Sequence, residues 1–196
     1  MIAATHLRRE RNLMELPVKV GLVYGSTRPG RFCDTVARWA ANRIAAHAGF
    51  AAEHIDPAQP DPSSGGLPLK ERLAACDAFI VVTPEYNHGY PAPLKALIDS
   101  YGEEWHAKPV AFISYGGISG GLRAVEQLRL VFAELHTVTV RDSVSFAGAW
   151  EQFDSSGALR NPERFERSMD TMLRRLHWWA ISLAHARSTW PYTKTA

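Results

Sequence analysis

The sequence predicts an α/β fold in which helices cover both faces of a five-stranded parallel sheet, with the strands in the order 2-1-3-4-5. Short apolar runs rich in β-branched residues alternate along the chain with amphipathic helical patterns, which is typical of a doubly wound sandwich. The 196 residues suit one domain of this kind. Ligands of such sheets bind beyond the carboxyl ends of the strands, where the strand order reverses. The loops after strands one, three and four therefore form the candidate site.

Each element of this fold has its own pattern in the sequence. Apolar residues at spacings of three and four, as in residues 120–135, indicate helices with one buried face. Asn161 is a favourable N-cap for the last helix, and Pro162 suits its first position. The predicted strands span residues 18–24, 51–55, 78–83, 110–114 and 137–140, and the helices before the last one span residues 32–47, 70–75, 92–100 and 120–135.

The last helix is expected to bury one apolar stripe against the sheet. Four tryptophans fit the core or an interface better than a cofactor site, namely Trp105, Trp150, Trp178 and Trp179. The stripe consists of Phe165, Met169, Met172, Leu176 and Trp179.

Residues 1–16 form an N-terminal extension that we expect to be flexible, and residues 17–196 form the single ligand-binding domain. The extension carries Arg8, Arg9 and Arg11 but no continuous apolar segment, so it does not resemble a signal peptide. No apolar run approaches the roughly 20 residues that span a bilayer. These features predict a cytoplasmic protein without membrane association.

The composition speaks against several classes of partner. The net charge is +2, and the 22 basic residues are interspersed with 20 acidic ones, so we expect no nucleic-acid partner. Cys33 and Cys76 are the only cysteines, and they lie far apart and outside any CxxC pattern. This speaks against a disulfide framework, an iron–sulfur cluster or a zinc site. We therefore expect no metal site.

The loop after the first strand reads GSTRPGR over residues 25–31 and leads directly into a helix. Its glycines allow a tight turn, its hydroxyl and amide groups are donors, and the helix N-terminus favours an anion. Arg28 and Arg31 can bind a terminal phosphate through paired hydrogen bonds, and the alternative is a solvated turn whose arginines face water. A nucleoside triphosphatase is not favoured, because Arg31 and Phe32 replace the P-loop lysine and its magnesium-binding hydroxyl.

The loop after the third strand reads PEYNHGYPAPLK and begins at Pro84. Its prolines and glycine fix its shape, so its amides and the side chain of Asn87 can match the polar edge of a flavin ring. The alternative is a rigid turn that stabilises the following helix, with Tyr86 and Tyr90 as packing residues. We expect Glu85 to orient the loop or to contact a subunit rather than to act as an acid or base.

The loop after the fourth strand reads SYGGISGG and begins at Ser114. Its four glycines allow a planar ligand to approach the backbone closely. Glycine-rich loops before helices are common, so this pattern alone indicates little about function. Its position in the predicted sheet is more informative. All three unusual loops fall on the same rim of the predicted sheet.

Together, the three loops resemble those of the NADPH-dependent FMN reductase family, which comprises flavodoxin-like quinone, azo-dye and metal-ion reductases. The resemblance covers about residues 18–146, and its most specific element is the PEYN stretch. It implies a flavodoxin-like fold, an FMN phosphate on the first loop and the flavin ring between the other two. The cofactor-binding residues expected on this basis are Ser26, Thr27, Arg28, Arg31, Phe32, Cys33, Pro84, Glu85, Tyr86, Asn87, Ser114, Tyr115, Gly116 and Gly117.

Two positions depart from the GSxRxxSxN pattern that family members often show. Arg31 and Cys33 stand where those members have the second Ser and the Asn, so we expect a more cationic phosphate site here. A helix N-terminus lowers the pKa of a thiol, which makes a redox role for Cys33 one alternative to a structural role. His88 has two interpretations, a residue at the flavin edge or an exposed loop histidine.

The resemblance also implies a function. NADPH or NADH passes a hydride to the flavin N5, and a small acceptor (a quinone, free flavin, an azo dye or a metal ion) then takes its place in a ping-pong cycle. The flavin carries this chemistry, so no catalytic side chain is expected. Loops on one face of the sheet usually leave a cleft that a partner subunit completes, so we expect a homodimer or homotetramer. The alternatives are a flavodoxin-like electron carrier and a flavin-bound regulatory protein, both without turnover of their own.

Overall fold

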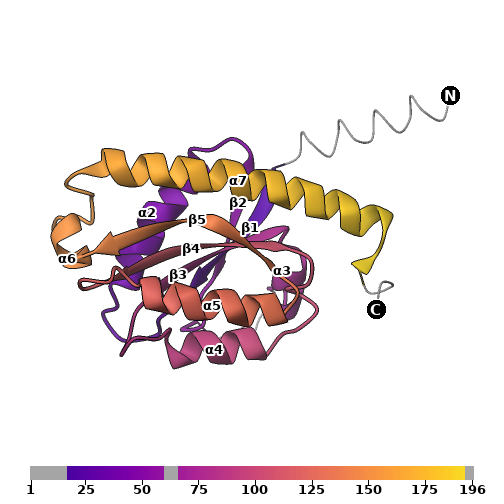
Figure 1. Cartoon of the computed structure of the whole chain (residues 1–196), viewed down its shortest axis with the longest axis horizontal. Coiled ribbons are helices and arrows are strands. Elements are labelled where there is room, and N and C mark those ends of the chain that lie inside the picture. Colours follow the sequence, from indigo (N-terminus) through magenta and orange to yellow (C-terminus); the bar gives the residue numbers. More distant parts are fainter. Residues whose placement is uncertain (1–16, 60–65, 193–196) are drawn as a thin grey trace.

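A computed structural model describes residues 17–59 and 66–192, and it confirms the predicted architecture (Figure 1). The sheet has five parallel strands in the order β2-β1-β3-β4-β5. The predicted N-terminal extension, residues 1–16, lies outside the described residues. The strands are β1 (Val18–Tyr24), β2 (Phe50–Ile55), β3 (Ala78–Pro84), β4 (Pro109–Gly116) and β5 (Val138–Ala147), and the helices are α2 (Cys33–Ala45), α3 (Leu69–Ala74), α4 (Ala92–Asp99), α5 (Leu122–Glu134), α6 (Ala149–Gln152) and α7 (Pro162–Thr189).

The sheet is covered on both faces. Helices α2 and α7 pack on one face, and α3, α4 and α5 pack on the other (Figure 1). Every residue of the central strands β3 and β4 is buried, as expected for parallel strands between two helical layers. Trp105 is fully buried, and its ring centroid lies 4.5 Å from that of Phe79. The hydrophobic cores on the two faces of the sheet hold the strands in place, and this sets the positions of the carboxyl ends of the strands.

Helix α7 begins at Pro162 as predicted, but the side chain of Asn161 makes no capping hydrogen bond. Asn161 is exposed, so water can satisfy the first amides of the helix instead. The buried stripe follows the prediction as far as Leu176 and then continues through Ala180. The expected burial of Trp179 is wrong, since this large ring lies at the edge of the stripe and is only partly covered.

Strand β5 is longer than the sequence predicted and ends at Ala147. It lies at an edge of the sheet, and its second half alternates between buried residues, such as Val144 and Phe146, and more exposed ones. The prediction relied on continuous apolar runs, which an edge strand does not need. The extension brings Gly148 to the loop after β4, where its amide donates to the carbonyl of Gly117 at 2.9 Å.

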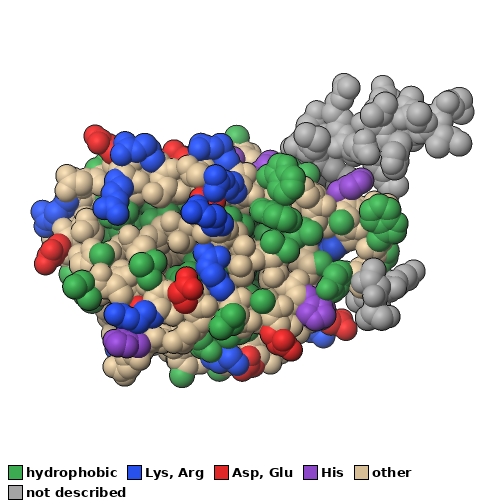
Figure 2. Space-filling view, viewed as in Figure 1, with side chains coloured by type: hydrophobic (Ala, Val, Ile, Leu, Met, Phe, Trp, Pro, Cys, Tyr) green, Lys and Arg blue, Asp and Glu red, His purple; other side chains and the backbone are tan. Residues whose placement is uncertain are grey.

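Charged side chains of both signs are mixed on the face formed by α7, β5 and α5 (Figure 2). None of the helices in the described part of the chain is long and apolar enough to cross a membrane. Within residues 17–59 and 66–192, no group of three or more His, Cys, Asp or Glu side chains is arranged to hold a metal ion.

Candidate functional site

Three loops meet at the carboxyl edge of the sheet, where the strand order reverses between β1 and β3. The amide of Gly25 donates to the carbonyl of Val82 at 2.7 Å, which joins the loop after β1 to β3. The amide of Glu85 donates to the carbonyl of Tyr115 at 3.2 Å, which joins the loop after β3 to β4. The structure therefore brings the sequence-predicted loops together at one edge.

The loop after β1, residues 25–32, presents hydrogen-bond donors. Ser26 is fully buried, and its Oγ is hydrogen-bonded to the hydroxyl of Tyr86 at 2.8 Å. The amides of Thr27 and Gly30 have no acceptor among the described residues. Gly30 adopts a φ of +63°, and a Cβ at this position would meet no atom within 4 Å. Two unpaired amides therefore lie in a partly exposed turn just before the N-terminus of α2.

The two arginines of this loop have different surroundings. The guanidinium of Arg28 stacks over the ring of Tyr86, 3.6 Å from the centroid, and has no carboxylate partner in the described part of the chain. Nη1 and Nη2 of Arg31 donate to the two carboxylate oxygens of Asp56 at 2.7 and 2.5 Å. Nε of Arg31 donates to Asp34 at 2.8 Å. These carboxylates offset the charge of Arg31, so the expectation of a more cationic loop is wrong.

Phe32 and Cys33 lie at the base of this loop and pack against the core. The ring of Phe32 contacts those of Tyr115 and Trp150, with centroids 5.9 and 6.2 Å apart. Cys33 is fully buried, and its Sγ lies 3.7 Å from the carbonyl of Val82. Burial raises the pKa of the Cys33 thiol and outweighs any effect of the helix N-terminus. A redox role needs a thiolate, so this burial favours the structural role of Cys33.

The loop after β3 contains a tight two-residue turn. Tyr86 and Gly89 exchange backbone hydrogen bonds of 2.9 and 3.0 Å. Between them, Asn87 and His88 adopt φ values of +51° and +68°, a region that asparagine tolerates better than most residues. Both side chains are exposed, and Gln127 of α5 supports the turn by donating to the carbonyl of His88 at 2.9 Å. The geometry fits both earlier interpretations, a rigid turn and a ligand-binding edge.

Glu85 connects the loops after β3 and β4. Its side chain is 7% exposed and accepts a hydrogen bond from Oγ of Ser119 at 2.8 Å. It also accepts hydrogen bonds from the backbone amide and the guanidinium of Arg123, at 3.1 and 2.7 Å. Burial alone would raise the pKa of this carboxyl, but the hydrogen bonds from Arg123 and Ser119 hold it below its ordinary value. This contact supports the predicted orienting role of Glu85.

At the end of β4, the side chains of Ser114 and Tyr115 point into the protein. Oγ of Ser114 donates to the carbonyl of Gly120 at 2.8 Å, and Tyr115 is 3% exposed. Gly121 adopts a φ of +85°, and a Cβ there would lie 2.7 Å from that of Ser114, so only glycine fits. Gly117 is exposed, with no atom within 4 Å of its Cβ position. A planar ligand can therefore approach the backbone at Gly117.

Sequence reasoning missed three residues that hold these loops, namely Asp56, Ser119 and Arg123. Asp56 follows β2 directly, so its position after a parallel strand was a usable signal. Ser119 lies within the glycine-rich stretch that the sequence singled out. Arg123 carried no signal, because an arginine in the first turn of an amphipathic helix is ordinary.

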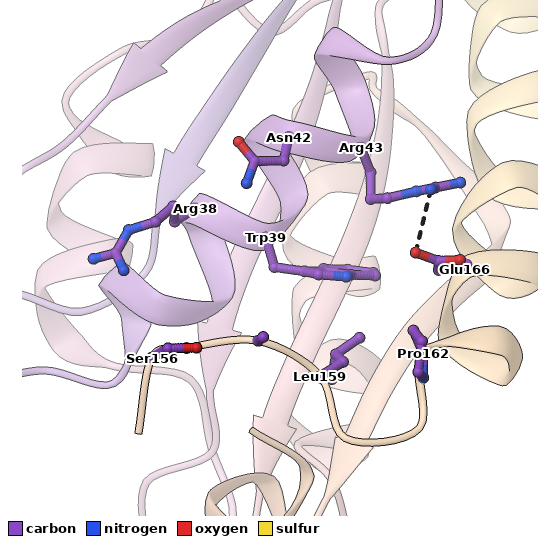
Figure 3. Close-up of a pocket in the computed structure, with 10 residues that line it drawn as sticks. Arg38, Trp39, Asn42, Arg43, Ser156, Leu159, Pro162 and Glu166 are labelled. Atoms are coloured by element: carbon purple, nitrogen blue, oxygen red, sulfur yellow. Dashed lines mark hydrogen bonds and ion pairs between the residues drawn. The ribbon is translucent and has the colours of Figure 1, made fainter. Parts of the chain in front are cut away.

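A separate pocket of about 530 Å³ lies on the outer surface of α2 (Figure 3). Arg38 and Trp39 of α2 line one wall, and Leu159, in the loop before α7, lines the opposite wall. Arg43 of α2 and Glu166 of α7 also line it, and Arg43 donates to Glu166 at 3.3 Å. No residue of the three carboxyl-edge loops lines this pocket, so it is distinct from the candidate site.

Known proteins share both the sequence and the fold. Residues 18–151 match the NADPH-dependent FMN reductase family. An NAD(P)H-dependent FMN reductase of Schizosaccharomyces pombe is 33% identical over 126 residues, which cover 56% of this chain and 63% of that protein. A probable NADPH:quinone oxidoreductase of Oryza sativa is 29% identical over 177 residues, which cover 80% of this chain and 89% of that protein.

Solved structures show the same fold. The flavoenzyme FerB of Paracoccus denitrificans, an NAD(P)H:acceptor oxidoreductase, aligns with a TM-score of 0.65 at 19% identity, over 83% of this chain and 97% of that one. A flavodoxin of Streptococcus pneumoniae aligns with a TM-score of 0.56 at 14% identity, over 81% of this chain and 97% of that one. These likenesses confirm the flavodoxin-like fold. With the family match over residues 18–151, the chain belongs to the NADPH-dependent FMN reductase family.

Proposed function

We propose that this chain is an FMN-dependent NAD(P)H oxidoreductase that reduces small electron acceptors, such as quinones, free flavin, azo dyes or metal ions. Membership of the reductase family supports the reaction class. The observation that carries the proposal is the meeting of two kinds of surface at one sheet edge. Arg28 and the nearby unpaired amides suit a phosphate, and the exposed backbone at Gly117 suits a flat ring.

The loop after β1 fits the phosphate of FMN. Arg28 supplies a cation that no described carboxylate neutralises, and the amides of Thr27 and Gly30 supply donors. The N-terminus of the 13-residue helix α2 adds a favourable dipole for an anion. Ser26 anchors the turn through Tyr86. Riboflavin lacks the phosphate and would leave these donors unused.

The other two loops fit the isoalloxazine ring. The turn at Asn87 offers an exposed amide side chain and exposed backbone for the polar edge of the ring. The amides of Glu85 and Tyr86 already donate within the protein. Gly117 offers exposed backbone without a side chain, directly after the buried Gly116. Because Glu85 hydrogen-bonds across both loops, their separation is fixed before a ligand binds.

Bound FMN supplies hydride acceptance and electron transfer at its N5 position. The side chains of this edge bind and orient the cofactor. Glu85 is held as a carboxylate by its hydrogen bonds, and burial raises the pKa of Tyr115, which keeps it a neutral phenol. Neither group exchanges a proton near neutral pH. The proposal therefore keeps the expectation that the flavin, and no side chain, carries the chemistry.

Steady-state kinetics of the FMN-loaded chain test this function. If bound FMN leaves one ring face open, NAD(P)H and the acceptor would occupy the same space in turn. We therefore expect parallel double-reciprocal lines when NADPH or NADH is varied against a quinone. Intersecting lines would contradict the single-face site. Absence of turnover by protein that binds FMN would favour the electron carrier or the regulatory protein.

A homodimer or homotetramer is part of the proposal. Ile118, Leu122 and Trp150 are 96%, 50% and 62% exposed, and they lie in or beside the loop after β4. The hydrogen bond from Gly148 to Gly117 brings α6 to that loop, so all three exposed apolar residues lie on segments that meet there. Exposed apolar surface next to a binding site is typical of a subunit contact. Light scattering during gel filtration measures the assembly, and a monomer at micromolar concentration would contradict it.

A further inference from the structure

We propose that Arg31 is a positioning residue that holds the loop after β1 in its FMN-binding shape through an ion pair with Asp56, and that Arg31 does not itself contact the phosphate. This role rests on the proposed function, because it concerns the loop that binds FMN. The two arginines of this short loop then have different roles. Arg28 contacts the FMN phosphate, and Arg31 hydrogen-bonds to other residues of the chain.

The guanidinium of Arg31 has little hydrogen-bonding capacity left for a ligand. An arginine has five N–H donors. Nε of Arg31 donates to Asp34, and Nη2 donates to Asp56. Nη1 donates to both Asp56 and the carbonyl of Ser26, at 2.7 and 2.5 Å. The side chain is only 10% exposed, so a phosphate could reach it only by displacing a carboxylate.

Asp56 is itself anchored to the sheet. It follows β2, whose last residue, Ile55, lies opposite Val23 of β1. Its side chain is 8% exposed, and Oδ1 accepts a further hydrogen bond from the amide of Ala58 at 3.0 Å. Burial alone would raise the pKa of this carboxyl, but the hydrogen bonds from Arg31 hold it below its ordinary value. The pair is therefore ionised at neutral pH and fixed at the ends of two neighbouring strands.

The ion pair acts on the phosphate site through the backbone of the loop. Nη1 of Arg31 donates to the carbonyl of Ser26, and the amide of Arg31 donates to the carbonyl of Arg28 at 3.2 Å. These bonds span the turn that carries the unpaired amides of Thr27 and Gly30. Loss of the ion pair would release the side chain of Arg31 and loosen that turn. The cation of Arg28 would remain.

Asp56→Asn separates the two possible roles of Arg31. If Arg31 positions the loop, the neutral amide weakens the pair, and FMN affinity falls about tenfold or more because the donors are misplaced. If Arg31 binds the phosphate, the substitution frees its guanidinium, and FMN affinity holds or rises. That second result would overturn the proposal. Quenching of FMN fluorescence on titration of the purified full chain measures the affinity.

Three further variants complete the test. Arg31→Gln is the matched partner variant, and the double variant Arg31→Gln/Asp56→Asn should lose about as much affinity as either single one. Arg28→Gln should add its own loss to that of Asp56→Asn. Riboflavin affinity is the second readout, and it should change little in all of these variants. Losses from Arg31→Gln and Asp56→Asn that add fully would contradict a coupled pair.

The outcomes distinguish this role from the proposed function. A wild-type chain that does not bind FMN overturns the proposed function. A wild-type chain that binds FMN while Asp56→Asn binds equally well overturns only the positioning role.

A measurement on the wild-type chain removes any dependence on the folding of variants. With FMN bound, NMR should show ¹⁵N–³¹P coupling across hydrogen bonds to the guanidinium of Arg28 and none to that of Arg31. Coupling to Arg31 would overturn the proposal.

Discussion

The loop after β1 and the loops after β3 and β4 use their residues in opposite ways. In the first, the cation of Arg28 and two amides have no charged or backbone partner among the described residues, so the residue types indicate the charge of the ligand. In the other two, side chains such as Glu85 and Ser114 hydrogen-bond within the protein, and backbone is left exposed at Gly117. The first region is therefore suited to select charge, and the second is suited to select shape.

The largest effect is expected where the second region depends on glycine. Gly121→Ala places a Cβ 2.7 Å from that of Ser114 at a φ of +85°. Backbone strain and overpacking should lower the free energy of unfolding by roughly 2–5 kcal/mol. FMN and riboflavin binding should both weaken. Urea unfolding measures the change.

Gly117→Ala is the matched control, because no atom lies within 4 Å of that Cβ position. Its stability should stay within about 0.5 kcal/mol of wild type. Equal stability of the two variants would show that the packing at Gly121 does not hold the loop.

Arg28→Ala tests the first region. A hydrogen bond to a charged group contributes about 1.5–3 kcal/mol, so FMN should bind about ten- to a hundredfold more weakly. Riboflavin affinity and the free energy of unfolding should stay near wild type, since the side chain is exposed. Parallel fluorescence titrations with both flavins measure this. Equal losses for the two flavins would mean that Arg28 contacts the ring or ribityl chain instead.

Glu85→Gln should show the opposite selectivity. It removes the charge that Arg123 and Ser119 bind, so the two ring loops loosen, and FMN and riboflavin affinity should fall by the same factor of about ten. Lys95→Gln is a control for loss of an exposed ion pair, that with Asp99, and should change both affinities little. A loss confined to FMN would place Glu85 in the phosphate site.

The smallest effect is the acid dependence of stability. A carboxyl whose pKa is lowered on folding stabilises the fold above its unfolded pKa, and this contribution is lost as pH falls through the folded pKa. The ordinary pKa of Glu85 is 4.5, and its folded value is lower. The stability difference between wild type and Glu85→Gln should therefore be constant above about pH 5 and shrink below about pH 4.5. Urea unfolding at several pH values measures it, and a difference that persists to pH 2 would contradict this account.

The sequence was sufficient for the architecture because strands with strong apolar runs alternate with amphipathic helices. It was insufficient at the sheet edge, where Val144 and Phe146 alternate with polar residues and the strand is stabilised by pairing with β4. The burial of Trp179 was also predicted wrongly, because its helical position lies at the edge of the stripe and Ala180 lies within it.

The place of the candidate site followed from topology, since the carboxyl ends of parallel strands meet at one edge. The contacts of individual side chains could not be predicted from the topology. Arg31 pairs with Asp56, 25 residues away, and Glu85 pairs with Arg123, 38 residues away. The charge of each side chain shows that it can form an ion pair, but only the folded structure shows with which residue. The same holds for Cys33, where burial outweighs its position at a helix N-terminus.

The central claim is that the loop after β1 recognises a phosphate on a flavin. Titration of the wild-type chain with FMN and with riboflavin, under identical buffer conditions, tests it most directly. Arg28 and the amides of Thr27 and Gly30 should make FMN bind about ten- to a hundredfold more tightly than riboflavin. Equal affinity for the two flavins would contradict the claim.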